Sequence, residues 1–118
     1  LKQSLDIVRD LRDKEREGVI LSNISQLYDV RGDYVAALEY AKQAETVQMA
    51  IGEKAGLCAT LYNIGHLYWD NNQQEEALSV WQRSYRMAKS MGLVEVLSGF
   101  EQLAEKVDLP EAFSSWEQ

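Results

Sequence analysis

The chain has 118 residues, of which 46% are hydrophobic and 26% charged, a composition typical of one small globular domain. No apolar run approaches the roughly 18 residues that a membrane-spanning helix needs, so we expect no membrane partner. The net charge of −7 disfavours binding to the phosphate backbone of a nucleic acid and favours a basic or apolar partner surface.

Two long segments of the chain repeat each other at a distance of 40 residues. The sequence KEREGVILSNI at 14–24 aligns with KAGLCATLYNI at 54–64. The match continues from SQLY at 25–28 to GHLY at 65–68, and resumes where Ala37-Leu38 pairs with Ala77-Leu78. Self-similarity at a fixed period is typical of an array of stacked supersecondary units.

The spacing of apolar residues predicts helices in chain order near 1–11, 14–30, 34–50, 54–70, 74–90 and 93–107, then a short one near 110–118. The first segment aligns with the second helix of each later pair, because the 40-residue shift carries Leu5, Val8 and Leu11 onto Glu45, Gln48 and Ile51. Gly52 and Gly92 follow the second helices, where a glycine commonly ends a helix. Arg12 occupies the equivalent earlier position, so the turn expected there must close without glycine.

Each period has two helices with one packed face apiece. The inward positions of the first helices are Leu21, Ile24, Ser25 and Tyr28, repeated by Leu61, Ile64, Gly65 and Tyr68. The inward positions of the second helices are Ala37, Leu38, Ala41 and Ala44, repeated by Ala77, Leu78, Trp81 and Ser84. The small residues in these sets let paired helices approach closely, and turn residues at 31–33 and 71–72 separate them.

The motif LYNIGHLY from Leu61 to Tyr68, followed by Ala77 and Trp81, resembles the tetratricopeptide repeat signature, and LSNISQLY at 21–28 is similar to it. The period exceeds the family's usual length of about 34 residues and resembles its longer-helix branch, which includes Pins-type adaptors and bacterial repeat proteins. The resemblance implies an all-α fold, a right-handed superhelical solenoid of stacked antiparallel hairpins with about seven helices. Ser25 departs from the family's glycine at that position.

The expected organisation is a single repeat domain over 1–118. Residues 1–12 correspond to the second helix of a preceding repeat, 13–52 and 53–92 to two full repeats, and 93–118 to a partial repeat with a capping helix. Pro110 suits the start of that last helix, and Phe113 and Trp116 its apolar side. Because 1–12 lacks a partner helix, we expect the chain to be a fragment of a longer array.

The resemblance also implies that the first helices line a concave face, where a peptide or helix of a partner protein binds. The helical wheel places a strip of side chains opposite the packed face of these helices. The candidate site residues are Val19, Ser22, Asn23, Gln26, Ala59, Tyr62, Asn63, His66, Trp69, Asp70 and Gln102. Val30 extends the strip in the first repeat, and Ser98, Glu101 and Glu105 extend it in the third.

Two features of this strip favour a binding role, and each has a structural alternative. Asn23 and Asn63 coincide under the 40-residue shift, and an asparagine can hydrogen-bond the main chain of an extended peptide; an exposed or capping asparagine is the alternative. Tyr62, His66 and Trp69 offer flat apolar area with polar tips; packing against an adjacent helix is the alternative.

Charged residues in the strip narrow the expected ligand. Glu101 and Glu105 can meet a cation on the ligand, or form a solvated acidic face. The strip carries no lysine or arginine in the two full repeats. The resemblance to chaperone-binding members, which grip a terminal carboxylate with such residues, therefore does not extend to this mode of binding.

No catalytic or metal motif is present in the sequence. Phosphate loops, paired cysteines and nucleophile elbows are absent, and Cys58 and His66 would lie about 80° apart around one helix. Cys58 has no second cysteine for a disulfide and is interpreted as a small half-buried hydrophobe. We expect no enzyme activity, no cofactor and no metal, but a cytoplasmic protein-binding module. The alternatives are a self-associating module that forms a homo-oligomer, and a sensor region that controls an effector domain outside these residues.

Overall fold

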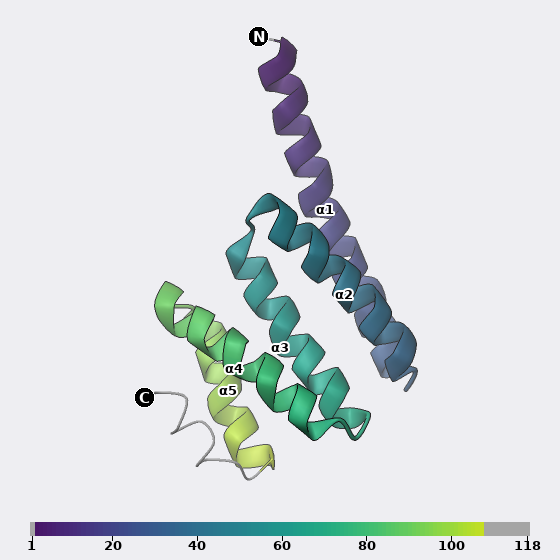
Figure 1. The fold of residues 1–118 in the computed structure, drawn as a ribbon, viewed down its shortest axis with the longest axis vertical. Helices are drawn as coiled ribbons and strands as arrows, with labels where there is room; N and C mark the ends of the chain where they lie inside the picture. The colour runs from purple at the N-terminus through teal and green to yellow at the C-terminus, as the bar shows by residue number, and fades with distance from the viewer. Residues whose placement is uncertain (1, 108–118) are drawn as a thin grey trace.

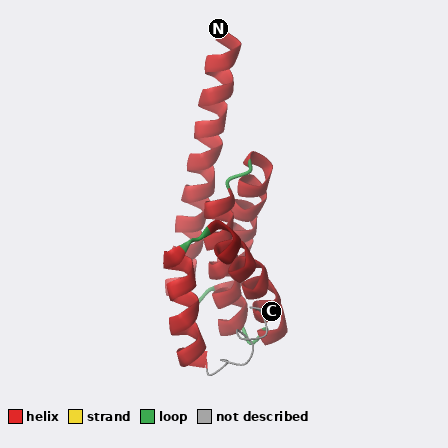
Figure 2. Cartoon of the chain, turned by 90° about the vertical axis from the view of Figure 1, so that its left-hand side faces the viewer, coloured by secondary structure: helices red, strands yellow, loops and turns green. Residues whose placement is uncertain are grey.

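The computed structural model describes the backbone of residues 2–107 and the side chains of residues 10–103, and it contains helices and no strands over this range (Figure 2). The helices are α1 (Lys2–Val30), α2 (Tyr34–Ile51), α3 (Lys54–Asp70), α4 (Gln74–Met91) and α5 (Val94–Val107) (Figure 1). The all-α class expected from the sequence is therefore confirmed for the part of the chain that the structure describes.

The four turns between these helices share one backbone device. Each contains a residue with positive φ, spaced by 20 residues along the chain: Gly32 (81°), Gly52 (69°), Asn72 (63°) and Gly92 (67°). A left-handed residue ends the helix, and the next amide then closes the turn, as where Asp33 N donates to the carbonyl of Tyr28 at 3.0 Å. Because every turn is short, successive helices run antiparallel and pack side by side (Figure 1).

The expected turn near Arg12 is wrong, because α1 continues through it as a single helix. The segments 1–11 and 14–30, expected as two helices, are thus one. Arginine would lose about 1–2 kcal/mol in the left-handed conformation that Gly52 and Gly92 adopt at the equivalent positions. The N-terminal half of α1 projects beyond the other helices (Figure 1). The helix expected near 110–118, with Phe113 and Trp116, lies outside the described residues.

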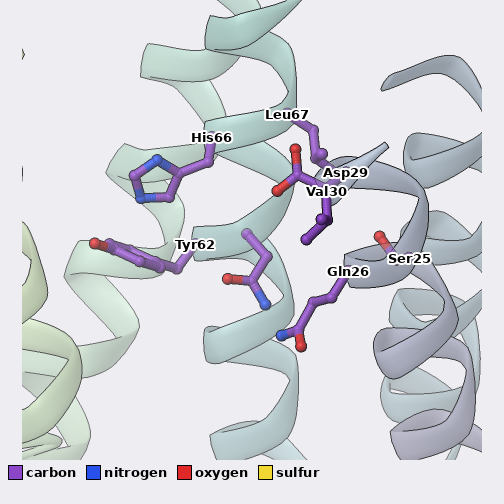
Figure 3. Close-up of a pocket in the computed structure, with 8 residues that line it drawn as sticks. Ser25, Gln26, Asp29, Val30, Tyr62, His66 and Leu67 are labelled. Atoms are coloured by element: carbon purple, nitrogen blue, oxygen red, sulfur yellow. The ribbon is translucent and has the colours of Figure 1, made fainter. Parts of the chain in front are cut away.

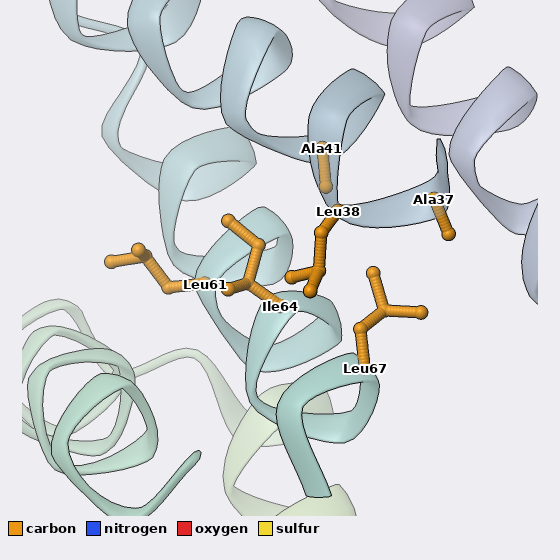
Figure 4. Packing of buried hydrophobic residues seen from close by; sticks show 6 residues of the cluster. All are labelled: Ala37, Leu38, Ala41, Leu61, Ile64 and Leu67. Carbon is orange, nitrogen blue, oxygen red and sulfur yellow. The ribbon is translucent and has the colours of Figure 1, made fainter. Parts of the chain in front are cut away.

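The first core cluster joins α2 to α3 (Figure 4). Its buried members are Ala37, Leu38 and Ala41 of α2 and Leu61, Ile64 and Leu67 of α3. Removing each of the larger side chains from water contributes about 1.5–3 kcal/mol. The alanines of α2 leave room for these side chains, so the two helices pack closely.

A second cluster joins α4 to α5 and reaches α3. Its buried members are Ala77, Trp81, Tyr85, Phe100 and Leu103, with Tyr62 and Trp69 packed against it. Trp81 is one of the largest fully buried side chains. This cluster packs against α3, so α3 lies between α2 on one side and α4 and α5 on the other.

Candidate functional site

A groove of about 410 Å³ opens between α1 and α3 (Figure 3). Its lining residues are Ser25, Gln26, Asp29 and Val30 from α1, and Tyr62, Asn63, His66 and Leu67 from α3. Gln26 and His66 hold the same position in their repeats, 40 residues apart. The groove therefore forms where two successive first helices lie next to each other.

Four of the candidate residues from the sequence meet in this groove: Gln26, Tyr62, Asn63 and His66. The other candidates do not line it. Val19, Asn23, Ala59, Asp70 and Gln102 are exposed, and Ser22 and Trp69 are half-buried. Asn23 and Asn63 hold equivalent positions on different helices, but only Asn63 lies on the side of its helix that borders the groove between α1 and α3.

Asp29 is the main groove residue that the sequence analysis missed. It lies in the groove beside Gln26 and opposite His66 (Figure 3). The 40-residue shift aligns Asp29 with Trp69, which the helical wheel places at the edge of the outward strip. The alignment with Trp69 could therefore have identified Asp29 as a candidate. Ser25 and Leu67 were also missed, because both also serve the packed side: Ser25 Oγ donates to the carbonyl of Ala37, and Leu67 belongs to the first cluster.

Tyr62 forms a rigid aromatic wall on one side of the groove. Its hydroxyl donates to the main-chain carbonyl of Gly99 at 3.2 Å. Its ring meets His66 edge to face at 4.6 Å and Phe100 at 4.9 Å between centroids. Burial raises the pKa of the Tyr62 hydroxyl, which further favours its protonated, hydrogen-bond-donating form.

Trp69, the third aromatic candidate, packs away from the groove. Its ring centroid lies 5.6 Å from that of Trp81, which is buried in the second cluster. His66 also contacts Trp81, edge to face at 5.2 Å, but it still lines the groove. Packing thus accounts for the position of Trp69, whereas His66 connects the core to the groove.

The carboxylate of Asp29 gives the groove a negative charge. Its pKa is raised, first by partial burial and then by the nearby carboxylate of Asp70, while His66 acts in the opposite direction. A carboxylate whose charged form is disfavoured gains when a cation arrives. The groove therefore combines an acidic group, two amide side chains and an aromatic wall.

This arrangement has groups that can hold a ligand, and the one cysteine is not among them. Cys58 lies buried on the other side of α3, where its Sγ donates to the carbonyl of Ser84 at 3.2 Å. Burial raises the pKa of this thiol, with hydrogen bonds from the Ser84 side chain and the Ala88 backbone acting against it. Over the residues that the structure describes, no three His, Cys, Asp or Glu side chains gather as they would around a metal ion.

Comparisons of the chain with protein-family models, curated proteins and solved structures found no match. Within residues 2–107, none of the helices combines the length and apolar character that crossing a membrane requires. Any inference about function therefore depends on the geometry of the groove and on the internal repeat.

Proposed function

We propose that the chain is a protein-interaction module that holds a peptide or helix of another protein in the groove between α1 and α3. The observation that carries this proposal is the convergence of Gln26, Tyr62, Asn63 and His66 on one open groove. Each of these residues was selected from the sequence by its outward position on a first helix, the helix that the family resemblance assigns to a concave binding face.

The chemistry of the groove suits a main chain flanked by side chains. The amides of Gln26 and Asn63 each offer donors and an acceptor, and they stand on opposite walls. A peptide lying along the groove can exchange hydrogen bonds with both walls at once. The Tyr62 ring, held by α5, supplies a flat apolar surface at low entropic cost.

Charge favours a basic ligand. Asp29 lines the groove, Asp70 is close enough to raise its pKa, and the chain as a whole carries a net charge of −7. A lysine or arginine of the partner would relieve the repulsion between these two carboxylates. The same charge disfavours a nucleic-acid partner.

The proposal extends to the kind of array. The 40-residue repeat and its antiparallel helix pairs support membership of the long-helix branch of tetratricopeptide repeats, and a right-handed superhelical solenoid as its architecture. Such an array acts as a scaffold in the cytoplasm, without a cofactor and without catalysis. The groove is then one unit of a longer concave surface.

The test begins with peptides selected on the 118-residue chain from a random display library, with binding measured by fluorescence polarisation. Asn63→Ala should weaken the selected peptides about tenfold, because it removes hydrogen bonds worth about 1–2 kcal/mol. Gln43→Ala is the matched control, since it removes an exposed amide from α2, away from the groove. Equal affinity for both variants would contradict the proposal.

A further inference from the structure

One face of α1 is uncovered, although the equivalent face of α3 is buried. Ile20 and Leu27 are 56% and 62% exposed, and both lie outside the groove. The 40-residue shift places them on Thr60 and Leu67, which are 3% and 2% exposed. These two repeat positions are thus exposed to solvent in the first repeat and buried in the second.

The helix that covers this face of α3 is α2. The hydroxyl of Thr60 donates to Oε1 of Gln48 at 2.6 Å, and Leu67 packs in the first cluster with Leu38. The uncovered face of α1 therefore has the position and the apolar character of a surface that receives a helix of the α2 type.

The chain contains a segment of that type. Residues 1–11 align with the second half of α2, and the shift carries Gln48 back to Val8. In the later repeat, a polar residue at 48 meets a polar residue at 60. At 8 and 20 the same two positions are valine and isoleucine, both apolar. The pair is thus polar at 48 and 60 and apolar at 8 and 20. Since both residues differ in the same direction, positions 8 and 20 suit each other as contact partners.

A single α1 helix cannot bring these two positions together. They are 12 residues apart, which corresponds to about 18 Å along a continuous helix. At residue 12, where Gly52 and Gly92 reverse the chain in later repeats, arginine continues the helix instead. The segment before it thus projects away from the face that it matches (Figure 1).

We propose that this face of α1 is covered by a second copy of the chain, whose own residues 2–11 lie across Ile20 in a reciprocal exchange. Exchange of an identical element uses contacts that the repeat already encodes, so two copies can close around each other. The exchange also covers a part of α1 that is open in one copy, since residues 10–17 are exposed there.

The occupant can be identified by a cysteine pair, Val8→Cys with Ile20→Cys, in the 118-residue chain. Under mild oxidation, the exchange predicts a disulfide between copies, seen as a covalent dimer on a non-reducing gel. The control pair is Val8→Cys with Val94→Cys, which uses an exposed apolar position on α5, and it should link far less. The unmodified chain controls for Cys58, which is buried. A disulfide within one chain, or no disulfide at the 8–20 pair, would overturn the proposal.

A second measurement does not depend on introduced cysteines. Sedimentation equilibrium should show a dimer of the unmodified chain, and Ile20→Glu should raise its dissociation constant at least about tenfold by placing a charge in the interface. Val94→Glu, at another exposed apolar site, should leave it unchanged. Arg12→Gly restores the residue found at 52 and 92, so it should let residues 2–11 fold back and produce monomers. An unmodified chain that is monomeric at every concentration would exclude the exchange, whether or not the groove binds peptides.

Discussion

The indole of Trp81 lies directly against the Cα of Gly65, and its Nε1 donates a hydrogen bond of 2.9 Å to the main-chain carbonyl of Tyr62. A Cβ at residue 65 would overlap the indole ring. In the first repeat the same two positions carry Ser25 and Ala41, so a larger residue on the first helix faces a smaller one on the second. In the second repeat the large side chain comes from the second helix, whereas in the first repeat the larger of the two residues is on the first helix.

This exchange predicts coupling between the two positions. Gly65→Ala should lower the free energy of unfolding by about 2–4 kcal/mol, because the new methyl group displaces Trp81 and weakens its hydrogen bond. Gly65→Ser with Trp81→Ala recreates the pair of the first repeat. In urea unfolding followed by circular dichroism, this double variant should lose at least about 1 kcal/mol less than the sum of its single variants. Strictly additive losses would show that the two residues do not share space.

The buried polar contact between α2 and α3 gives a second prediction. Thr60 and Gln48 are both buried and hydrogen-bonded at 2.6 Å. Thr60→Val should cost about 1–3 kcal/mol, because it leaves a buried amide oxygen without its donor. Adding Gln48→Leu removes that oxygen and should restore at least about 1 kcal/mol. If the double variant is no more stable than Thr60→Val in thermal unfolding, the contact does not act as a pair.

Asn72, the turn residue in the left-handed conformation, gives a third prediction. Its φ of 63° is the only positive value at a non-glycine position among the described residues. Asn72→Ala should destabilise the chain by about 1–2 kcal/mol, because a Cβ without a polar side chain disfavours this conformation. Asn72→Gly, the residue found at position 32, should be neutral or stabilising. Gln74→Ala, at an exposed site on α4, serves as the control in the same denaturant titration and should change little.

Asp29 gives a prediction about pH. Partial burial and Asp70 raise its pKa in the folded chain above the ordinary value of 3.8. The proton is therefore bound more tightly in the folded state, so this group favours folding below pH 3.8 and loses that contribution as the pH rises through its folded pKa. Asp29→Asn should raise the melting temperature at pH 7, and the gain should vanish in acid. A lower melting temperature at pH 7 would show that Asp29 is stabilised by a partner.

The same variant separates stability from binding. Since the carboxylate attracts a basic ligand, Asp29→Asn should weaken basic peptides selected on the chain while it stabilises the free fold. Glu39→Gln, which removes an exposed carboxylate from α2, controls for net charge. Equal weakening by both variants would assign the effect to the overall charge of −7 and not to the groove.

The helices between residues 34 and 107 could be predicted from the sequence because local signals agreed there. Gly52 and Gly92 marked helix ends, and the stripe from Ala37 to Ala44 marked the packed face of α2; the structure has the turns and the buried alanines in those places. The turn predicted near Arg12 was wrong because that prediction followed the repeat alignment, although arginine disfavours positive φ. Only a residue that tolerates positive φ ends a helix in this way.

The candidate site was predictable only in part. Rotation around a single helix identified Asn63 and His66, since it shows which side chains avoid the helix's own partner. It could not show which flank of α1 faces α3, and that decides that Asp29 lines the groove whereas Asn23 does not. The angle between neighbouring first helices arises from packing across the whole hairpin, so single-helix periodicity does not contain it.

A nuclear magnetic resonance titration of the labelled chain with a selected peptide tests the binding account most directly. The account predicts that the largest shifts fall on both walls of the groove, at the side-chain amides of Gln26 and Asn63 and the ring of His66, with the exposed residues of α2 and α4 unaffected. Shifts confined to α2 and α4, with both groove amides unmoved at saturation, would contradict it.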